Sequence, residues 1–143
     1  MNVQQQIEQY IDSQTATKRG DMQMLHHMIL SIMSGGKLWF LDGKNSENKI
    51  VSNPNIGYGS HTMRYADGTS KEFYQVGMSA NTTGVSVYIL GLNDKRYLAR
   101  KFAPDLGKAR VSGYCIKFKS LRDINTNILE LAIRDGFDNS LQS

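Results

Sequence analysis

Positive charge is concentrated in one stretch of the sequence, between Asp94 and Arg122. This stretch holds nine basic and two acidic residues, whereas the rest of the 143-residue chain holds eight basic and eleven acidic ones. The stretch therefore carries +7 and the remainder −3, within a net charge of +4. A positive field of this kind attracts phosphate groups or an acidic protein surface. The residues expected to bind such a partner are Lys95, Arg96, Arg100, Lys108, Arg110, Lys117 and Lys119.

The same basic residues would also suit a solvated face that keeps the protein soluble. Proteins that bind single-stranded nucleic acid combine cations with aromatic side chains, and no aromatic residues clearly interleave with the cations of this stretch. From the sequence alone, both interpretations of the stretch stay open.

Residues of the kinds used in catalysis are scattered along the chain. His26 and His27 are adjacent on a predicted helix, so their side chains point about 100° apart and do not chelate one ion together. No spacing supports a Ser–His–Asp or Cys–His–Asn arrangement. An enzyme would need a pocket that joins residues such as His61, Tyr65 and Cys115. We therefore favour a protein without catalytic residues.

The single cysteine excludes an internal disulfide and any cysteine-rich zinc site. Cys115 shares its predicted strand face with Lys117 and Lys119, whose ammonium groups would favour the thiolate if that face is exposed. The alternative is a small residue packed under a helix. The chain begins without a basic segment followed by an apolar run, so we expect no secretory signal and a cytoplasmic location. No stretch is long and apolar enough to predict a membrane span.

Apolar spacing predicts helices at both ends of the chain. Residues from Val3 to Ile11 and from Met22 to Met33 each form one apolar face, and Gly35 and Gly36 follow as a stop signal. A third helix is predicted from an Asn93–Asp94 cap to about Phe102, limited by the proline that follows. The last helix is predicted from Ile124, entered through Ser120 or Asp123 as its cap and ended by Gly136.

The middle of the chain is predicted to form strands. Segments with apolar residues in runs or at alternate positions are Leu38 to Leu41, Tyr58 to Tyr65, Lys71 to Met78, Val85 to Leu90 and Tyr114 to Phe118. Asp67-Gly68 predicts a hairpin turn. In the third segment, Lys71 to Met78, the side chains of Tyr74, Val76 and Met78 are expected on one side. The glycine-rich segment Asn55 to Ser60 is interpreted as a turn whose glycines allow a bulge or a close backbone approach.

This order of elements predicts an α+β protein, an antiparallel β-sheet with N- and C-terminal helices packed on one face. The length of 143 residues fits one domain over residues 1–143.

Several short segments, taken in order, resemble the YdhG-like family, a bacterial domain family of unknown function. They are Ile56-Gly57-Tyr58-Gly59, Val76-Gly77-Met78-Ser79, Leu106-Gly107-Lys108 and the stretch from Cys115 to Ile124. The similarity runs from about Ile7 to Ile133. The sequence departs from the family at Ser112-Gly113, where relatives usually carry Gly-Lys before the cysteine-bearing strand.

The resemblance implies a frataxin-like fold, and an iron-chaperone role has been proposed for some relatives. Iron delivery in frataxin-like proteins uses an acidic first helix, and the candidates for metal binding here are Glu8, Asp12 and Asp21. Hard cations prefer several carboxylates together, and two neighbouring basic residues partly offset these three. Iron is therefore the one cofactor that the resemblance suggests.

Two functions are expected. The first is a non-catalytic binding module for an anionic ligand, such as a phosphate-bearing molecule or an acidic protein. The alternative is a frataxin-like intracellular iron chaperone. A homodimer is compatible with either.

Overall fold

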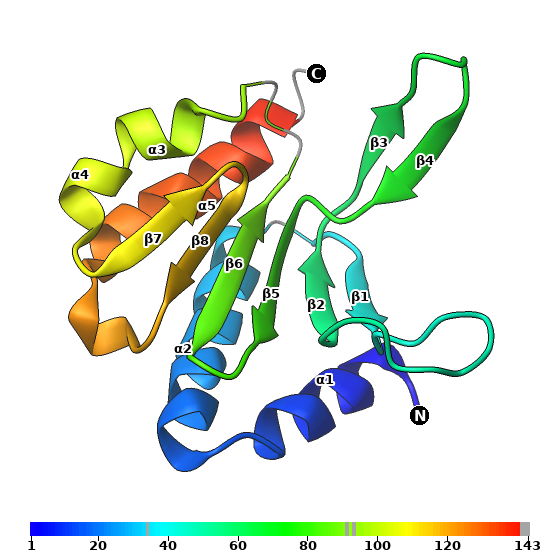
Figure 1. Cartoon of the computed structure of the whole chain (residues 1–143), viewed down its shortest axis with the longest axis horizontal. Helices are drawn as coiled ribbons and strands as arrows, with labels where there is room; N and C mark the ends of the chain where they lie inside the picture. Colours follow the sequence, from blue (N-terminus) through cyan, green and yellow to red (C-terminus); the bar gives the residue numbers. More distant parts are fainter. Residues whose placement is uncertain (34, 91, 93, 141–143) are drawn as a thin grey trace.

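A computed structural model describes residues 1–33, 35–90, 92 and 94–140 of the chain (Figure 1). Its centre is a six-stranded antiparallel sheet in the order β1-β2-β5-β6-β8-β7. A separate two-stranded hairpin, formed by β3 and β4, projects from it. The strands are β1 (Leu38–Leu41), β2 (Asn55–Tyr58), β3 (His61–Arg64), β4 (Ser70–Phe73), β5 (Val76–Ala80), β6 (Val85–Ile89), β7 (Ala109–Ser112) and β8 (Cys115–Phe118).

Helices from both ends of the chain pack against the sheet, and Figure 1 shows α2 and α5 behind it. The helices are α1 (Val3–Asp12), α2 (Ala16–Ile32), α3 (Tyr97–Lys101), α4 (Ala103–Leu106) and α5 (Thr126–Ser140), with a 3-10 turn, η1 (Leu121–Asp123), before α5. The predicted α+β class, with an antiparallel sheet and helices at both termini, is confirmed. No helix in the described residues has the length and apolar character needed to cross a membrane.

Strand alternation separates a buried sheet face from an open one. Successive side chains point to opposite sides of a strand, so every second residue faces the helices. The sheet residues on the helix side are Ile56, Tyr58, Val76, Met78, Val85, Val87, Ile89, Ile116 and Phe118, and they form one core with helical residues such as Ile7, Met22, Leu25, Ile29, Leu129 and Ile133. Burial of each such side chain contributes about 1.5–3 kcal/mol.

The glycine-rich segment is a strand at its start and not a turn. Gly57 in β2 pairs with Gly77 in β5, and the ring of Tyr74 lies flat on both. A Cβ atom at either glycine would lie 2.5 Å from that ring. The close approach expected of these glycines is therefore confirmed. The placement of Tyr74 on the side of Val76 and Met78 was wrong. Strand β4 ends before Tyr74 and β5 begins after it, so strand alternation is interrupted there and the Tyr74 ring lies on the open face.

Both predicted boundaries of the last helix differ in the structure. Helix α5 continues past Gly136, because a residue without a side chain lets the helix approach β6: a Cβ there would lie 2.5 Å from Ile89 Cγ2. Asn125 caps this helix, with its Oδ1 accepting from the Asn127 backbone N–H at 3.1 Å. The predicted end of the third helix near Phe102 is confirmed, because α3 ends at Lys101 with Phe102 as its C-cap, and Pro104 lies in the first turn of α4. The predicted Asn93 cap lies outside the described residues.

Strand β7 was not predicted. Its residues Ala109–Ser112 show only one apolar alternation, and pairing with β8 decides their conformation. Helix α2 also begins earlier than its apolar stripe, at Ala16, with Met22 as its first fully buried residue.

Candidate anion-binding site

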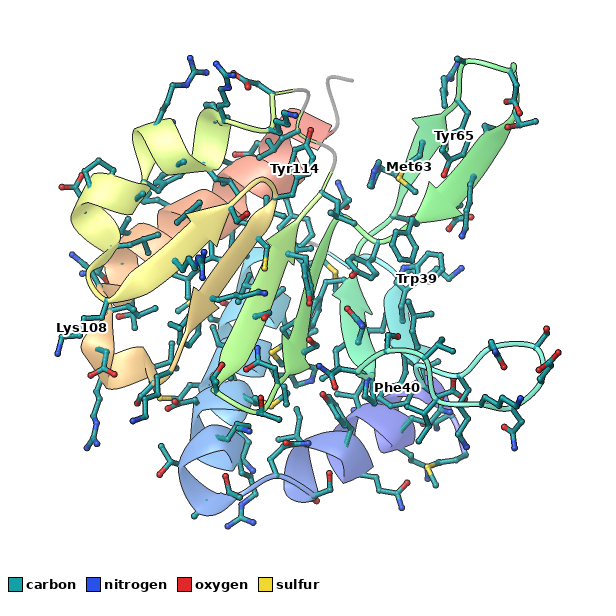
Figure 2. The ribbon with its side chains drawn as sticks, in the orientation of Figure 1. Trp39, Phe40, Met63, Tyr65, Lys108 and Tyr114 are labelled. Atoms are coloured by element: carbon teal, nitrogen blue, oxygen red, sulfur yellow. The ribbon has the colours of Figure 1, made fainter. Side chains whose placement is uncertain are left out.

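The structure divides the predicted basic residues into two groups. Lys108, Arg110, Lys117 and Lys119 lie on or beside β7 and β8, whereas Lys95, Arg96 and Arg100 lie on or just before α3. Figure 2 shows Lys108 at the lower left of the molecule, and the α3 ribbon at the upper left. Arg100 forms an ion pair with Asp94. Four of the seven predicted residues are thus brought together.

The sheet register explains why these four share one face. Arg110 is directly opposite Lys117, while the neighbouring Ala109 and Val111 point toward the helices. Lys108 and Lys119 lie one residue beyond the last pair of this register, Ala109 and Phe118. Like charges at opposed strand positions destabilise a sheet, so this arrangement works against the stability of the fold.

Two adjoining surface hollows open beside these residues. The first, about 750 Å³, is lined by Thr15, Thr17, Lys18, Thr82, Thr83, Gly84, Lys108, Lys119, Ser120, Arg122 and Asp123. The second, about 580 Å³, is lined by Thr83, Lys108, Ala109, Arg110, Lys117, Phe118 and Lys119. Thr83, Lys108 and Lys119 belong to both. We call the two together the basic hollow.

Separate segments are fixed around the basic hollow by specific contacts. Lys18 Nζ donates to the Asn81 carbonyl at 2.7 Å, which ties the start of α2 to the β5–β6 turn. Asp21 Oδ2 accepts from the Leu121 backbone N–H at 3.1 Å, which ties α2 to η1. The β5–β6 turn lies directly against β8, because a Cβ at Gly84 would be 2.1 Å from the Phe118 carbonyl oxygen. The walls of the hollow are therefore positioned without a ligand.

Hydroxyl groups and backbone donors complete the lining. The side chain of Asn81 accepts from both the backbone N–H and the hydroxyl of Thr83, at 3.0 and 2.9 Å, which fixes the conformation of the turn. Thr15 precedes α2 without a capping hydrogen bond from its side chain, and no acidic residue lies in the first helical turn. The positive end of this helix thus adds to the field of the basic side chains.

The charges of the basic hollow are not balanced locally. In the described part of the chain, none of Lys108, Arg110, Lys117, Lys119 and Arg122 takes part in an ion pair. Asp123 is the one carboxylate among the lining residues of the two hollows. Five exposed cations beside a single carboxylate create a site at which an anion is attracted.

Lys18 and Arg122 were missed as binding residues by the sequence analysis. Arg122 lies inside the basic stretch, so charge alone could have found it. Lys18 is distant in sequence, and only the contact between α2 and the β5–β6 turn brings it to the hollow.

The three carboxylates suggested for metal binding are not gathered in one place. Glu8 and Asp12 line a hollow of about 460 Å³ between α1 and α2, together with His26 and His27. Asp21 is instead bonded to η1. Among the described residues, no three His, Cys, Asp or Glu side chains lie close enough to hold a metal ion.

His26 is engaged with the core. Its Nδ1 lies 2.6 Å from the hydroxyl of Tyr58. Burial raises the pKa of Tyr58, and burial, followed by the charge of His27, lowers the pKa of His26. The neutral imidazole is therefore favoured, and Nδ1 and the Tyr58 hydroxyl share one hydrogen bond.

The residues considered for an enzyme lie on different elements. His61 is in β3 and Tyr65 follows it in the projecting hairpin, whereas Cys115 is in β8 (Figure 1). Burial raises the pKa of the Cys115 thiol, and the charge of Lys117 offsets this only in part. The thiol form therefore dominates near neutral pH.

Comparisons with protein families, with curated proteins and with solved structures find no match for this chain. The resemblance to the YdhG-like family stays a prediction from the sequence.

Proposed function

We propose that this chain is a non-catalytic binding module that holds a phosphate-bearing ligand in the basic hollow. The observation that supports this most is the convergence of cations from α2, β7, β8 and η1 on one hydroxyl-lined depression. The lysine and arginine side chains that line the basic hollow form no ion pairs with the carboxylates of the described residues.

The lining matches the chemistry of a phosphate group better than that of a solvated face. A phosphate offers several acceptor oxygens and negative charge, and the hollow offers ammonium, guanidinium and hydroxyl donors. Contacts such as Lys18 to Asn81 hold the donors of separate segments close together, which a face that only maintains solubility does not require. The carboxylates near α1 and α2 offer no comparable support for the iron-chaperone alternative.

Calorimetric titration with inorganic pyrophosphate tests the proposal. We expect binding to the unmodified protein and loss of the binding heat in the Lys108→Glu/Lys119→Glu variant. The matched control is Lys95→Glu/Arg96→Glu, which changes the net charge equally at the other basic group.

The control is expected to keep its affinity within about twofold, because at physiological salt charges beyond about 8 Å are largely screened. Equal losses in both variants would indicate a diffuse effect of net charge and overturn the assignment of the hollow. Absence of binding to the unmodified protein would overturn it as well.

A further inference from the structure

The basic hollow opens onto a sheet face that the helices leave uncovered. Arg110 and Lys117 line the hollow and also point to this open face. The helices that contact β5 and β6 do so from the other side, where Gly136 meets Val76 and Ile89. The same side of the sheet continues from Lys117 over Ser86, which is 1% exposed, and the half-buried Tyr88 toward the glycine pair of β2 and β5, which Tyr74 covers.

Aromatic side chains occupy the other half of the open face. Trp39 lies in β1 and is directly opposite Gly57. Its ring meets Phe73 edge to face at 5.9 Å, and Phe73 stacks on Tyr74 at 4.2 Å between centroids. Tyr74 is only 4% exposed, whereas Trp39 and Phe73 keep part of their rings accessible. We call Trp39, Phe73 and Tyr74 the aromatic row.

Cations accompany the aromatic row. Lys37 Nζ lies 4.0 Å from the centroid of the Trp39 ring, and Lys71 Nζ lies 5.5 Å from that of Phe73. Glu72 is already engaged, because it accepts from the Ser60 hydroxyl at 2.6 Å and lies 3.5 Å from Lys37. Each of these cations lies two residues before its ring in the sequence, and the fold brings the two pairs of ring and cation together.

We infer that the ligand of the basic hollow is single-stranded nucleic acid, with phosphates in the hollow and bases stacked on the accessible rings of the aromatic row, those of Trp39 and Phe73. This inference rests on the proposed function. Single strands are bound by a positive groove that follows the backbone together with aromatic rings that stack on bases. A simple phosphate compound needs only the hollow, and an acidic protein does not require stacking rings beside each cation.

The dimensions of the face fit a short strand. In Figure 2, Lys108 and Trp39 lie near opposite edges of the sheet, beside β7 and in β1. Six strands at about 4.8 Å spacing place β7 about 24 Å from β1. That width suits a site of several nucleotides, within the range of about 4–16 seen for a single binding fold.

The chain contains one tryptophan, so its fluorescence reports directly on the aromatic row. The test uses a fluorescein-labelled oligothymidylate of about 15 nucleotides to measure affinity by anisotropy, and the unlabelled oligomer for tryptophan fluorescence. We expect binding, quenching of Trp39, and loss of both in Lys108→Glu/Lys119→Glu. Inorganic polyphosphate is expected to bind the hollow without quenching.

Substitution of the aromatic row provides a second readout. Phe73→Leu keeps an apolar side chain and is expected to weaken oligothymidylate binding roughly fivefold or more, with pyrophosphate binding unchanged. The matched control is Tyr65→Leu, in the projecting hairpin and outside the row, which should bind normally. The fluorescence test needs no variant, so it remains decisive if Phe73→Leu fails to fold.

The outcomes separate this inference from the proposed function. Pyrophosphate binding without quenching by oligothymidylate would overturn the nucleic-acid ligand and leave the proposed function standing. Equal affinity for a duplex of the same length would overturn the single-stranded preference. An acidic polypeptide such as polyglutamate that binds more tightly than oligothymidylate would point to a protein partner and overturn the inference.

Discussion

Replacement of Gly57 by alanine tests the packing that creates the aromatic row. The added Cβ would lie 2.5, 2.7 and 2.8 Å from Cδ2, Cγ and Cβ of Tyr74. These atoms form the base of the ring, so a rotation at its far end does not relieve the contact. Tyr74 is also held by Phe73 and by a hydrogen bond from its hydroxyl to Asn55 Oδ1 at 3.1 Å.

The cost follows from these contacts. Overpacking a filled site costs about 1–3 kcal/mol, and loss of the Tyr74 hydrogen bond adds about 1 kcal/mol. Alanine has a lower backbone entropy than glycine in the unfolded chain, and this stabilises the native state by about 0.4–1 kcal/mol. We expect a net loss of about 2 kcal/mol, which corresponds to a fall in Tm of about 4–8 °C in a domain of this size.

Urea denaturation and thermal unfolding followed by circular dichroism provide the measurement. Gly20→Ala is the matched control. Gly20 lies in helix α2, and a Cβ added there would have no other atom within 4 Å. That variant should gain up to about 1 kcal/mol from helix propensity. The reasoning is refuted if Gly57→Ala is as stable as the unmodified protein, or if it is equally destabilising in a Tyr74→Gly background, where all three contacts are removed.

Two further predictions concern titration. Burial lowers the pKa of His26, and burial also lowers that of His61 against an opposing contribution from the Tyr74 backbone. The unfolded chain therefore binds more protons below about pH 6.5, so the free energy of unfolding should fall as the pH drops through that window, and less steeply in His26→Gln. Cys115 should react with iodoacetamide at pH 7 more slowly than free cysteine does, and an equal or faster rate would contradict the raised pKa of its thiol.

Helices and the central strand were predictable because their apolar periodicity is the direct cause of their burial. Val85, Val87 and Ile89 alternate in the sequence and are fully buried in β6. Strand β7 was not predictable, because Ala109 and Val111 carry a weak pattern and pairing with β8 supplies the missing energy. Gly136 was misread because a glycine ends a helix in isolation, whereas here it permits contact with Ile89.

The candidate site was predictable in its charge but not in its shape. The positive stretch is visible in the sequence, yet nothing there shows that Lys108 and Lys119 line the same hollow while Arg96 lies elsewhere. Trp39 and Phe73 are 34 positions apart, and they meet only because the hairpin folds back beside β1. Contacts of this range depend on sheet order, which local patterns do not encode.

The opposed cations of β7 and β8 link the binding site to the stability of the fold. Arg110 faces Lys117, and like charges at opposed strand positions destabilise a sheet by roughly 0.2–1 kcal/mol. An anion that binds between these strands removes part of that repulsion in the native state alone. Salt would screen the same repulsion without occupying a site. A specific ligand should therefore stabilise the protein more than sodium chloride of equal ionic strength, and that excess should disappear in Lys108→Glu/Lys119→Glu.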